Sequence, residues 1–176
     1  MKSNIVLIGF MGTGKTAVGQ VLAKRLNRPL VEVDSAIKKM AGKTIPEIFS
    51  NDGEIVFREL EIEAIKQAAI GEKQVIACGG GVVLNTINID RLRVTGVVVN
   101  LTASLETILK RIARDGDNRP LINVNWPAER IKELLKFRKP FYDSAADLTI
   151  NTAKLSIDNV AGKIIDRLKN YEGFNL

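Results

Sequence analysis

Apolar residues along the chain gather either in short continuous runs, which are typical of buried strands, or at the three- and four-residue spacing of helices. The short runs predict strands at residues 5–8, 30–33, 74–78, 96–101 and 148–150. The helically spaced stretches predict helices at residues 17–26, 35–40, 53–69, 87–93, 105–113, 128–137 and 156–170. Because strands and helices alternate, we expect a three-layer α/β fold, with a five-stranded parallel sheet covered by helices on both faces.

Local signals refine the predicted helices. Thr44-Ile-Pro-Glu47 has the pattern of a capping box, and Ser104 is placed to cap the helix at 105–113. In the helix at 53–69 we expect the apolar positions to pack inward; they are Ile55, Leu60, Ile62, Ile65 and Ala69. The polar stretch 114–125 is the longest loop-like segment in the sequence.

The composition is that of an ordinary globular protein, with 45% hydrophobic and 26% charged residues. A chain of 176 residues has the length of a single domain, which we expect to span residues 1–176. The apolar run 94–101 is far too short to cross a membrane. The N-terminus runs straight into the first predicted strand, and Cys78 is the single cysteine. We therefore expect no signal peptide and a reducing, cytoplasmic location.

The net charge of +6 narrows the expected partners. The basic residues form neither a tail nor a stripe, and few aromatic residues accompany them, so the excess does not indicate nucleic-acid binding. Polyanionic small molecules explain the charge equally well. We expect small-molecule ligands, no nucleic-acid or membrane partner, and a monomer.

One segment carries a specific chemical signal. Gly9-Phe-Met-Gly-Thr-Gly-Lys-Thr16 matches G-x-x-x-x-G-K-[ST] at every fixed position, after a predicted strand and at the start of a predicted helix. Gly12 and Gly14 let backbone N–H groups converge on an anion, and the helix N-terminus adds further donors. Lys15 would bridge the outer phosphates, and the Thr16 hydroxyl would hold Mg²⁺. The segment predicts a nucleoside-triphosphate site.

Further features bear on the molecule that is phosphorylated. Asp34 ends a predicted strand and could face the γ-phosphate, although it could also serve as a helix cap. Gly79–Gly81 follow another strand directly, which favours a ligand close to the backbone over a plain tight turn. Arg58 taken alone is explained as a surface arginine with helical partners. Arg119 and Arg138 lie beside prolines in charged stretches, and an arginine on a mobile flap is suited to closing over ATP.

Taken in order, these residues resemble the shikimate kinases over essentially the full chain. The resemblance rests on the segment Gly9–Thr16, Asp34, Phe49, Phe57-Arg58, Gly79–Gly81, Arg119-Pro-Leu, and Arg138 with Pro140, Tyr142 and Asp147. It implies a P-loop fold of the nucleoside-monophosphate-kinase type, with a substrate-binding segment at about 34–61 and a lid at about 113–125. It also implies ATP- and Mg²⁺-dependent phosphorylation of the 3-hydroxyl of shikimate, a step of chorismate and aromatic amino acid biosynthesis.

The resemblance assigns a role to each matching residue. The implied nucleotide contacts are Gly12, Thr13, Gly14, Lys15, Thr16, Ala17, Arg111 and Arg119, with Thr16 also the metal contact. The implied substrate contacts are Asp34, Phe49, Phe57, Arg58, Gly79, Gly80, Gly81 and Arg138. Lys15, Asp34 and Arg119 would be catalytic, and Arg58 and Arg138 would clamp the substrate carboxylate. Many members have Asp-x-Asp where this chain has Glu32-Val-Asp34.

Other functions stay open at this point. A gluconate or nucleoside-monophosphate kinase could share the fold, because paired arginines could bind a phosphate as well as a carboxylate. A GTPase switch would need D-x-x-G and N-K-x-D, and neither occurs in the sequence. A ligand-binding module without catalysis would tolerate the loss of Lys15, Thr16, Asp34 or Arg119, and all four are present.

Overall fold

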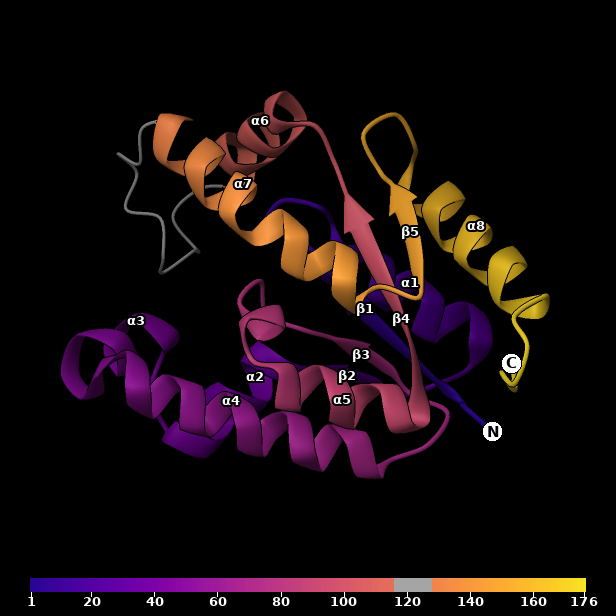
Figure 1. Cartoon of the computed structure of the whole chain (residues 1–176), viewed down its shortest axis with the longest axis horizontal. Coiled ribbons are helices and arrows are strands. Elements are labelled where there is room, and N and C mark those ends of the chain that lie inside the picture. Colours follow the sequence, from indigo (N-terminus) through magenta and orange to yellow (C-terminus); the bar gives the residue numbers. More distant parts are fainter. Residues whose placement is uncertain (116–127) are drawn as a thin grey trace.

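The computed structural model describes residues 1–115 and 128–176, and its centre is a parallel sheet with helices on both faces (Figure 1). The strands are β1 (Asn4–Ile8), β2 (Leu30–Glu32), β3 (Val75–Ala77), β4 (Gly96–Thr102) and β5 (Leu148–Asn151). The helical segments are α1 (Lys15–Leu26), α2 (Val33–Ala41), α3 (Ile45–Glu47), η1 (Ile48–Asp52), α4 (Gly53–Ile70), η2 (Val82–Leu84), α5 (Thr86–Thr95), α6 (Leu105–Asp115), α7 (Ala128–Ala145) and α8 (Ile157–Lys169). The predicted three-layer α/β fold is confirmed.

The order of the strands brings all their carboxyl ends to one edge of the sheet. The order is β2-β3-β1-β4-β5, and every neighbouring pair is parallel. Ile5 in the central strand β1 lies opposite Val75 on one side and Val97 on the other. In open sheets of this kind, ligands bind outside the carboxyl ends of the strands. The loops after β1, β2 and β3 are therefore in position to build one site.

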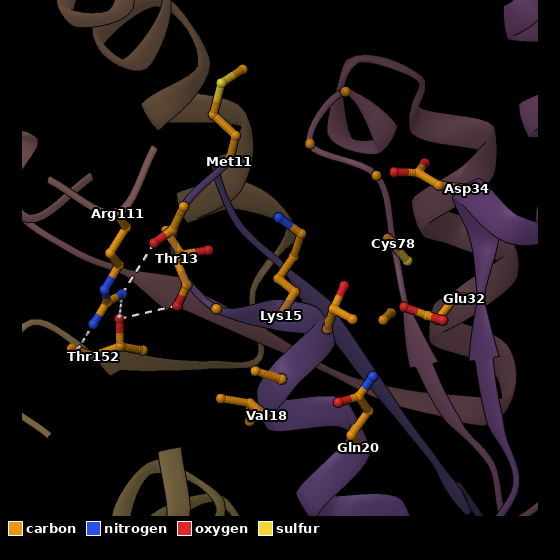
Figure 2. A pocket seen from close by; sticks show the side chains of 18 of the residues that line it. Met11, Thr13, Lys15, Val18, Gln20, Glu32, Asp34, Cys78, Arg111 and Thr152 are labelled. Carbon is orange, nitrogen blue, oxygen red and sulfur yellow. Dashed lines mark hydrogen bonds between the residues drawn. The ribbon is translucent and has the colours of Figure 1, made fainter. Parts of the chain in front are cut away.

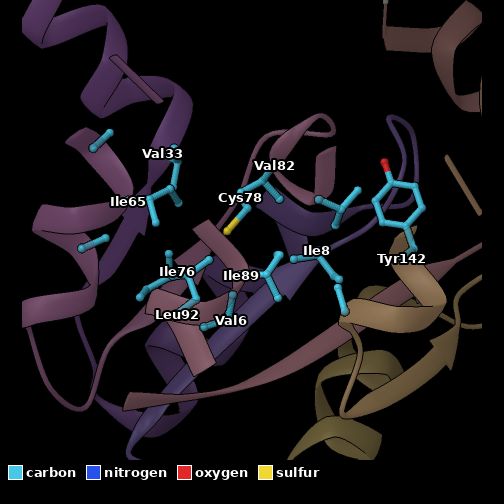
Figure 3. Close-up of a cluster of buried hydrophobic side chains, with 14 of the residues drawn as sticks. Val6, Ile8, Val33, Ile65, Ile76, Cys78, Val82, Ile89, Leu92 and Tyr142 are labelled. Atoms are coloured by element: carbon cyan, nitrogen blue, oxygen red, sulfur yellow. The ribbon is translucent and has the colours of Figure 1, made fainter. Parts of the chain in front are cut away.

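Alternation along β1 divides the core between the two faces of the sheet. Ile5 and Leu7 pack in one cluster with side chains of α1 and α8. Val6 and Ile8 pack in the other, with side chains of α2, α4, α5 and α7 (Figure 3). Burial on both faces explains why this strand is a continuous apolar run rather than an alternating one. None of the described helices is both long and apolar enough to cross a membrane.

Helix α7 is longer than the sequence predicts. We expected it to end at residue 137, but it continues to Ala145 with Pro140 inside it. Proline costs a helix one hydrogen bond and some strain, which tertiary packing can offset. Tyr142 and Ala145, which come after the proline, are both buried against the core. This packing places Arg138 and Tyr142 four residues apart on one helical face.

The inward face of α4 also differs from the expected one. Ile55 is 77% exposed, whereas Phe57, Glu61 and Ala64 are buried with Ile65. The five-residue π-helical segment η1 precedes α4 and joins it at Gly53, where φ is +86°. Ile55 is two residues before the buried Phe57 in the same α-helix, which places it about 160° away around the helix axis. Ile55 therefore lies on the side of α4 that faces away from the core, although its apolar character suggested the inward face.

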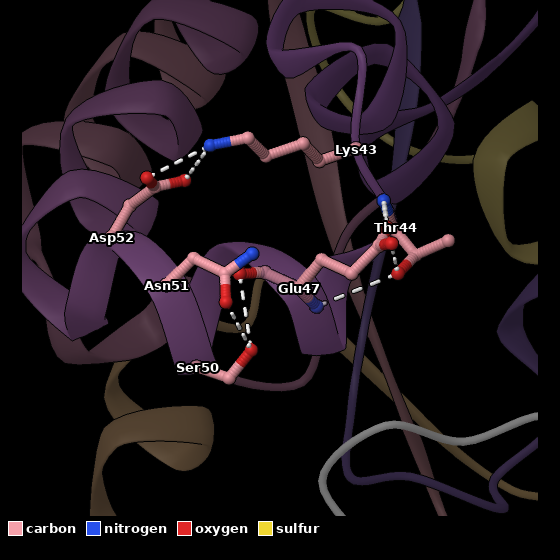
Figure 4. A network of polar contacts seen from close by, with 6 residues as sticks. All are labelled: Lys43, Thr44, Glu47, Ser50, Asn51 and Asp52. Carbon is pink, nitrogen blue, oxygen red and sulfur yellow. Dashed lines mark hydrogen bonds and ion pairs between the residues drawn. The ribbon is translucent and has the colours of Figure 1, made fainter.

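A network of polar contacts stabilises the segment that connects α2 to α4 (Figure 4). The predicted capping box is confirmed, because the Thr44 hydroxyl accepts from the Glu47 N–H and the Glu47 carboxylate accepts from the Thr44 N–H. Lys43 donates to both carboxylate oxygens of Asp52 at 2.7 and 2.8 Å. These contacts join the two ends of the segment that contains α3 and η1.

The packing of α5 against the sheet can be tested at Leu92. Leu92 is fully buried beside Val6 and Ile76 (Figure 3), so Leu92→Ala should lower the free energy of unfolding by about 2–5 kcal/mol through lost burial and a cavity. Val94→Ala, on the same helix at a position that is 75% exposed, is the control and should change it by less than about 0.5 kcal/mol. Urea unfolding followed by circular dichroism measures both. Equal losses in the two variants would contradict the assigned helix face.

Candidate active site

The loop after β1 forms an anion cradle that only glycine can build at its tightest points. Gly9 has φ +142°, and a Cβ there would lie 2.3 Å from the Leu101 carbonyl oxygen. Gly12 and Gly14 also have positive φ, at +76° and +95°. Gly14 ends the loop as the N-cap of α1, so the first amides of the helix face the same space. The predicted phosphate loop thus has the backbone that an anion site requires.

Lys15 is already held over this loop. Its ammonium donates to the carbonyl oxygens of Gly9 at 2.8 Å and Phe10 at 3.0 Å. The charge therefore lies at the mouth of the cradle rather than in bulk water, and Figure 2 shows the side chain pointing from the loop into the cleft. A fixed cation beside converging N–H groups suits the outer phosphates of a nucleotide.

The predicted loops line a single cleft of about 1200 Å³ at the carboxyl edge of the sheet. Its volume exceeds that of a typical one-ligand pocket, so it can hold a nucleotide and a second small molecule. Most of the candidate residues among the described part of the chain line it; they are Gly12, Thr13, Gly14, Lys15, Thr16, Ala17, Asp34, Phe57, Arg58, Gly79, Gly80, Gly81, Arg111 and Arg138. Phe49 instead packs behind the wall, with its ring centroid 4.6 Å from that of Phe57. Arg119 and most of the expected lid lie outside the described residues.

Asp34 comes after β2 in the first turn of α2 and faces the cleft opposite Lys15 (Figure 2). Its carboxylate is accessible to solvent, but the crowded walls of the cleft strip part of its hydration. This desolvation raises the pKa of Asp34 above its ordinary value, against the positive charges of Lys15 and Lys38, which lower it, and with a smaller raising effect of Glu32. Asp34 is therefore an accessible carboxylate with more proton affinity than a surface aspartate.

The three successive glycines make room for the charged side chains of the site. A Cβ on Gly79 would lie 2.7 Å from Asp34 Oδ1, and a Cβ on Gly81 would lie 2.6 Å from Arg58 Nη1. None of Gly79–Gly81 has a positive φ. Backbone conformation is thus not the reason for glycine here. Close approach is the reason, and at Gly79 and Gly81 the approaching groups are the protein's own side chains.

Arg58 is fixed by two carboxylates along α4. Its Nη1 donates to Glu61 Oε2 at 3.0 Å, and its Nη2 donates to Glu54 Oε1 at 3.1 Å. Glu61 is 1% exposed, and burial raises the pKa of its carboxyl while the charge of Arg58 lowers it. The guanidinium also lies 5.2 Å from the centroid of the Phe57 ring. Arg58 therefore pairs with acidic side chains of its own helix and also lines the cleft.

Arg138 and Tyr142 reach the same loop from the extended part of α7. The Tyr142 hydroxyl donates to the Gly80 carbonyl at 2.5 Å, and Arg138 Nη1 donates to it at 3.4 Å. Burial raises the pKa of Tyr142 to about 12, so the hydroxyl keeps its proton. Arg138 is only 8% exposed, yet its Nε has no hydrogen-bond partner within the described residues. A buried guanidinium with an unused donor favours an anionic ligand beside it.

The opposite end of the cleft is bounded by α6 and by the connection from β5 to α8. Arg111 donates to the Gly12 carbonyl at 3.1 Å and to Thr152 through both terminal nitrogens at 2.9 Å. Leu155 and Ile157 line the cleft nearby. A planar cation next to aliphatic side chains can hold a flat ring, so this end suits a nucleobase.

The donor set fits magnesium bound together with phosphate. Thr16 is exposed to the cleft at the start of α1, and Glu32 and Asp34 lie across from the loop (Figure 2). Residues 1–115 and 128–176 contain no cluster of three or more His, Cys, Asp or Glu side chains that could hold a metal by itself. Mg²⁺ commonly binds through one or two protein oxygens, substrate phosphates and water, which this arrangement can supply.

Sequence reasoning missed some residues that position the site. From the sequence, Arg58 was explained through helical partners at the surface, but its partner Glu61 is buried, and an acidic residue among buried helical positions is a detectable signal. The role of Tyr142 depends on the continuation of α7 past Pro140, which the sequence did not predict. Thr152 comes after a short strand and carries no recognisable local signal.

A phosphate cradle, a fixed lysine, an accessible carboxylate and a cationic acceptor pocket in one cleft define a P-loop kinase that acts on a small molecule. The shikimate kinase family model matches residues 11–169. A shikimate kinase of Thermodesulfovibrio yellowstonii is 51% identical over 96% of this chain and 95% of its own length. The chain therefore belongs to the shikimate kinase family, whose members transfer phosphate from ATP, with Mg²⁺, to a hydroxyl of shikimate.

Solved structures agree with this assignment. A shikimate kinase from Acinetobacter baumannii, determined in complex with shikimate, is similar with a TM-score of 0.91 and 36% identity, covering 98% of this chain and 96% of that one. The shikimate kinase of Aquifex aeolicus is similar with a TM-score of 0.80 and 32% identity, covering 94% and 96% of the two chains. Family and fold thus agree over nearly the whole length.

The close approach at Gly81 gives a testable consequence. A methyl group at Gly81 must displace the Arg58 guanidinium, a flexible group, so Gly81→Ala should raise the KM for shikimate about 10-fold while leaving the unfolding temperature within about 2 °C. Gly162→Ala in α8 is the control, because its new methyl group would meet only Arg25 Nη1 at 3.7 Å. Steady-state kinetics and thermal unfolding measure both. An unchanged KM would show that Arg58 does not need this position.

Proposed function

We propose that this site phosphorylates the 3-hydroxyl of shikimate with the residues that line the cleft, and that the enzyme acts as a cytoplasmic monomer. The observation that carries the proposal is the loop Gly79–Gly81, against which Asp34, Arg58 and Arg138 all lie, in the same cleft as the phosphate cradle. One cleft then holds a phosphate donor and a pocket with both a cationic and an anionic side. That combination suits an acceptor that carries a carboxylate and several hydroxyls.

The two arginines would bind the carboxylate of the acceptor. Arg58 is oriented by Glu54 and Glu61, and Arg138 brings a buried Nε that has no hydrogen-bond partner among residues 1–115 and 128–176. Guanidinium groups bind carboxylates through paired, charge-assisted hydrogen bonds, which fixes orientation as well as supplying affinity. With the carboxylate anchored at Arg58 and Arg138, the hydroxyl side of the ring would face Asp34.

Asp34 would accept a hydrogen bond from the reacting hydroxyl and receive its proton as the new O–P bond forms. Phosphoryl transfer needs mainly alignment and electrostatic stabilisation, so a modestly basic carboxylate is sufficient. Lys15 and the loop amides would neutralise charge on the transferring group and on the ADP that leaves. We propose the segment at about 34–61 as the substrate-binding part, and Arg119 in the expected lid at about 113–125 as a further phosphate contact.

The decisive experiment is a coupled assay of ADP release with MgATP and four acceptors: shikimate, quinate, gluconate and AMP. Arg58→Ala should lower kcat/KM for shikimate about 10- to 100-fold, because a charged hydrogen-bonding group is lost. Asp34→Asn should lower kcat about 10²- to 10⁴-fold. Lys66→Ala, an exposed position on the same helix as Arg58, is the control and should keep full activity.

Each outcome of this assay is informative. Turnover with shikimate alone, sensitive to both site variants, supports the proposal. Turnover with gluconate or AMP would support kinase activity but contradict shikimate as the acceptor. Absence of turnover with all four, together with measurable MgATP binding, would identify a binding module instead.

The raised pKa of Asp34 predicts a shift in the pH profile. If the carboxylate form is required, kcat/KM for shikimate falls as the pH drops through this pKa, so the acid limb should lie above the ordinary aspartate value of about 3.9. Lys38 lowers this pKa, so Lys38→Met should move the acid limb to higher pH. Lys39→Met, the exposed neighbour that does not contribute, is the matched control. A profile in which both lysine variants match the wild type would contradict the assignment to Asp34.

A further inference from the structure

Three segments that are distant in sequence meet at one buried threonine beside the nucleotide end of the cleft. Thr152, between β5 and α8, is 2% exposed and contacts both Thr13 of the phosphate loop and Arg111 of α6 (Figure 2). Thr13 is itself 1% exposed. A polar contact that is closed off from water on both sides is strongly oriented, because each group has few alternatives.

The Thr152 hydroxyl both accepts and donates hydrogen bonds inside the protein. A hydroxyl has one proton to donate and accepts through its lone pairs. Arg111 Nη1 donates to Thr152 Oγ1 at 2.9 Å, and Oγ1 lies 3.1 Å from the carbonyl oxygens of Thr13 and Thr102. The Thr102 carbonyl already receives the Thr152 N–H at 2.8 Å. The Thr102 carbonyl thus has a second donor in the Thr152 N–H, whereas the contact with the Thr13 carbonyl is the one that links the hydroxyl to the phosphate loop.

This contact fixes the orientation of a peptide group in the phosphate loop. In a trans peptide the C=O and the following N–H point in opposite directions. Holding the Thr13 carbonyl toward Thr152 turns the Gly14 N–H the other way, toward the space in front of α1. The Gly12 carbonyl is held to the same side by Arg111 at 3.1 Å. Two successive carbonyls of the loop are thus kept away from the anion position.

The same contacts fix the plane of the Arg111 guanidinium. Nη1 bonds to Gly12 and to the Thr152 hydroxyl, while Nη2 bonds to the Thr152 carbonyl at 2.9 Å. Three bonds from two nitrogens leave the planar group little freedom to rotate. A fixed plane at the cleft wall is what stacking on a flat base requires.

We propose that Thr152 is a positioning residue for the nucleotide, which sets the Thr13–Gly14 peptide for the phosphates and the Arg111 plane for the base. The inference rests on the nucleotide site of the proposed function and adds a residue at the cleft wall that acts through the loop peptide and Arg111. It predicts that loss of the hydroxyl alone weakens binding of the phosphates as well as of the complete nucleotide. Shikimate, at the other end of the cleft, should bind as before.

Thr152→Val removes the hydroxyl and keeps the shape of the side chain, and Thr152→Ser keeps the hydroxyl and removes the methyl group. Isothermal titration calorimetry with MgADP, inorganic tripolyphosphate and shikimate measures the three affinities. We expect Thr152→Val to weaken MgADP and tripolyphosphate by about 10-fold each, because the Thr13 carbonyl and Arg111 each lose a partner. Shikimate should bind within about 2-fold of the wild type, and Thr152→Ser should bind all three within about 3-fold.

Several outcomes would overturn the inference. Unchanged affinity of Thr152→Val for MgADP and tripolyphosphate would do so, even if its unfolding temperature fell, since a merely structural residue would behave in that way. A loss confined to MgADP would also overturn it, because the loop peptide would then be independent of the hydroxyl. If Thr152→Val does not fold, Thr152→Ala compared with Thr152→Ser provides the same contrast. A wild-type protein that binds neither MgADP nor tripolyphosphate would instead refute the nucleotide site itself.

Discussion

The acceptor side of the site depends on charged side chains that lie against a bare backbone at Gly79–Gly81. Asp34 and Arg58 approach so closely that a Cβ at Gly79 or Gly81 would lie within 2.7 Å of them, and Arg138 shares the Gly80 carbonyl with Tyr142. Because this loop comes directly after β3, beside β1 in the sheet, it brings the acceptor pocket next to the phosphate loop. Replacing these glycines would separate the charges from one another and from the phosphate donor.

Parts of the molecule that depend on local rules could be predicted from the sequence. The strands, the helix order and the phosphate loop agree with it, because burial on both faces and a fixed motif determine them. The extension of α7 to Ala145 could not be predicted, since Pro140 is locally unfavourable and only packing of Tyr142 and Ala145 offsets its cost. The exposed Ile55 was placed wrongly because it was assigned by its apolar character, whereas its position lies on the side of α4 away from the buried Phe57.

In the candidate site, too, local signals could be predicted and long-range contacts could not. The residue types and their order indicated a kinase, but the reason for three glycines was visible only in space, where side chains from α2 and α4 meet them. Thr152 illustrates the limit most clearly, because its importance arises from contacts with residues 139 and 41 positions away. Interactions at such separations depend on the topology of the sheet and leave no local pattern.

The balance of charge in the cleft explains why its ligands should be anions. Glu61 is buried and forms an ion pair with Arg58, so part of the guanidinium charge is compensated within the protein. Lys15 and Arg138 each donate to backbone carbonyl oxygens of the loops that line the cleft. Arg138 is 8% exposed, and its Nε has no hydrogen-bond partner in the described part of the chain, which is unfavourable when no anion is bound. An arriving carboxylate would relieve that cost, so the geometry that weakens the free protein slightly is the same one that selects its ligand.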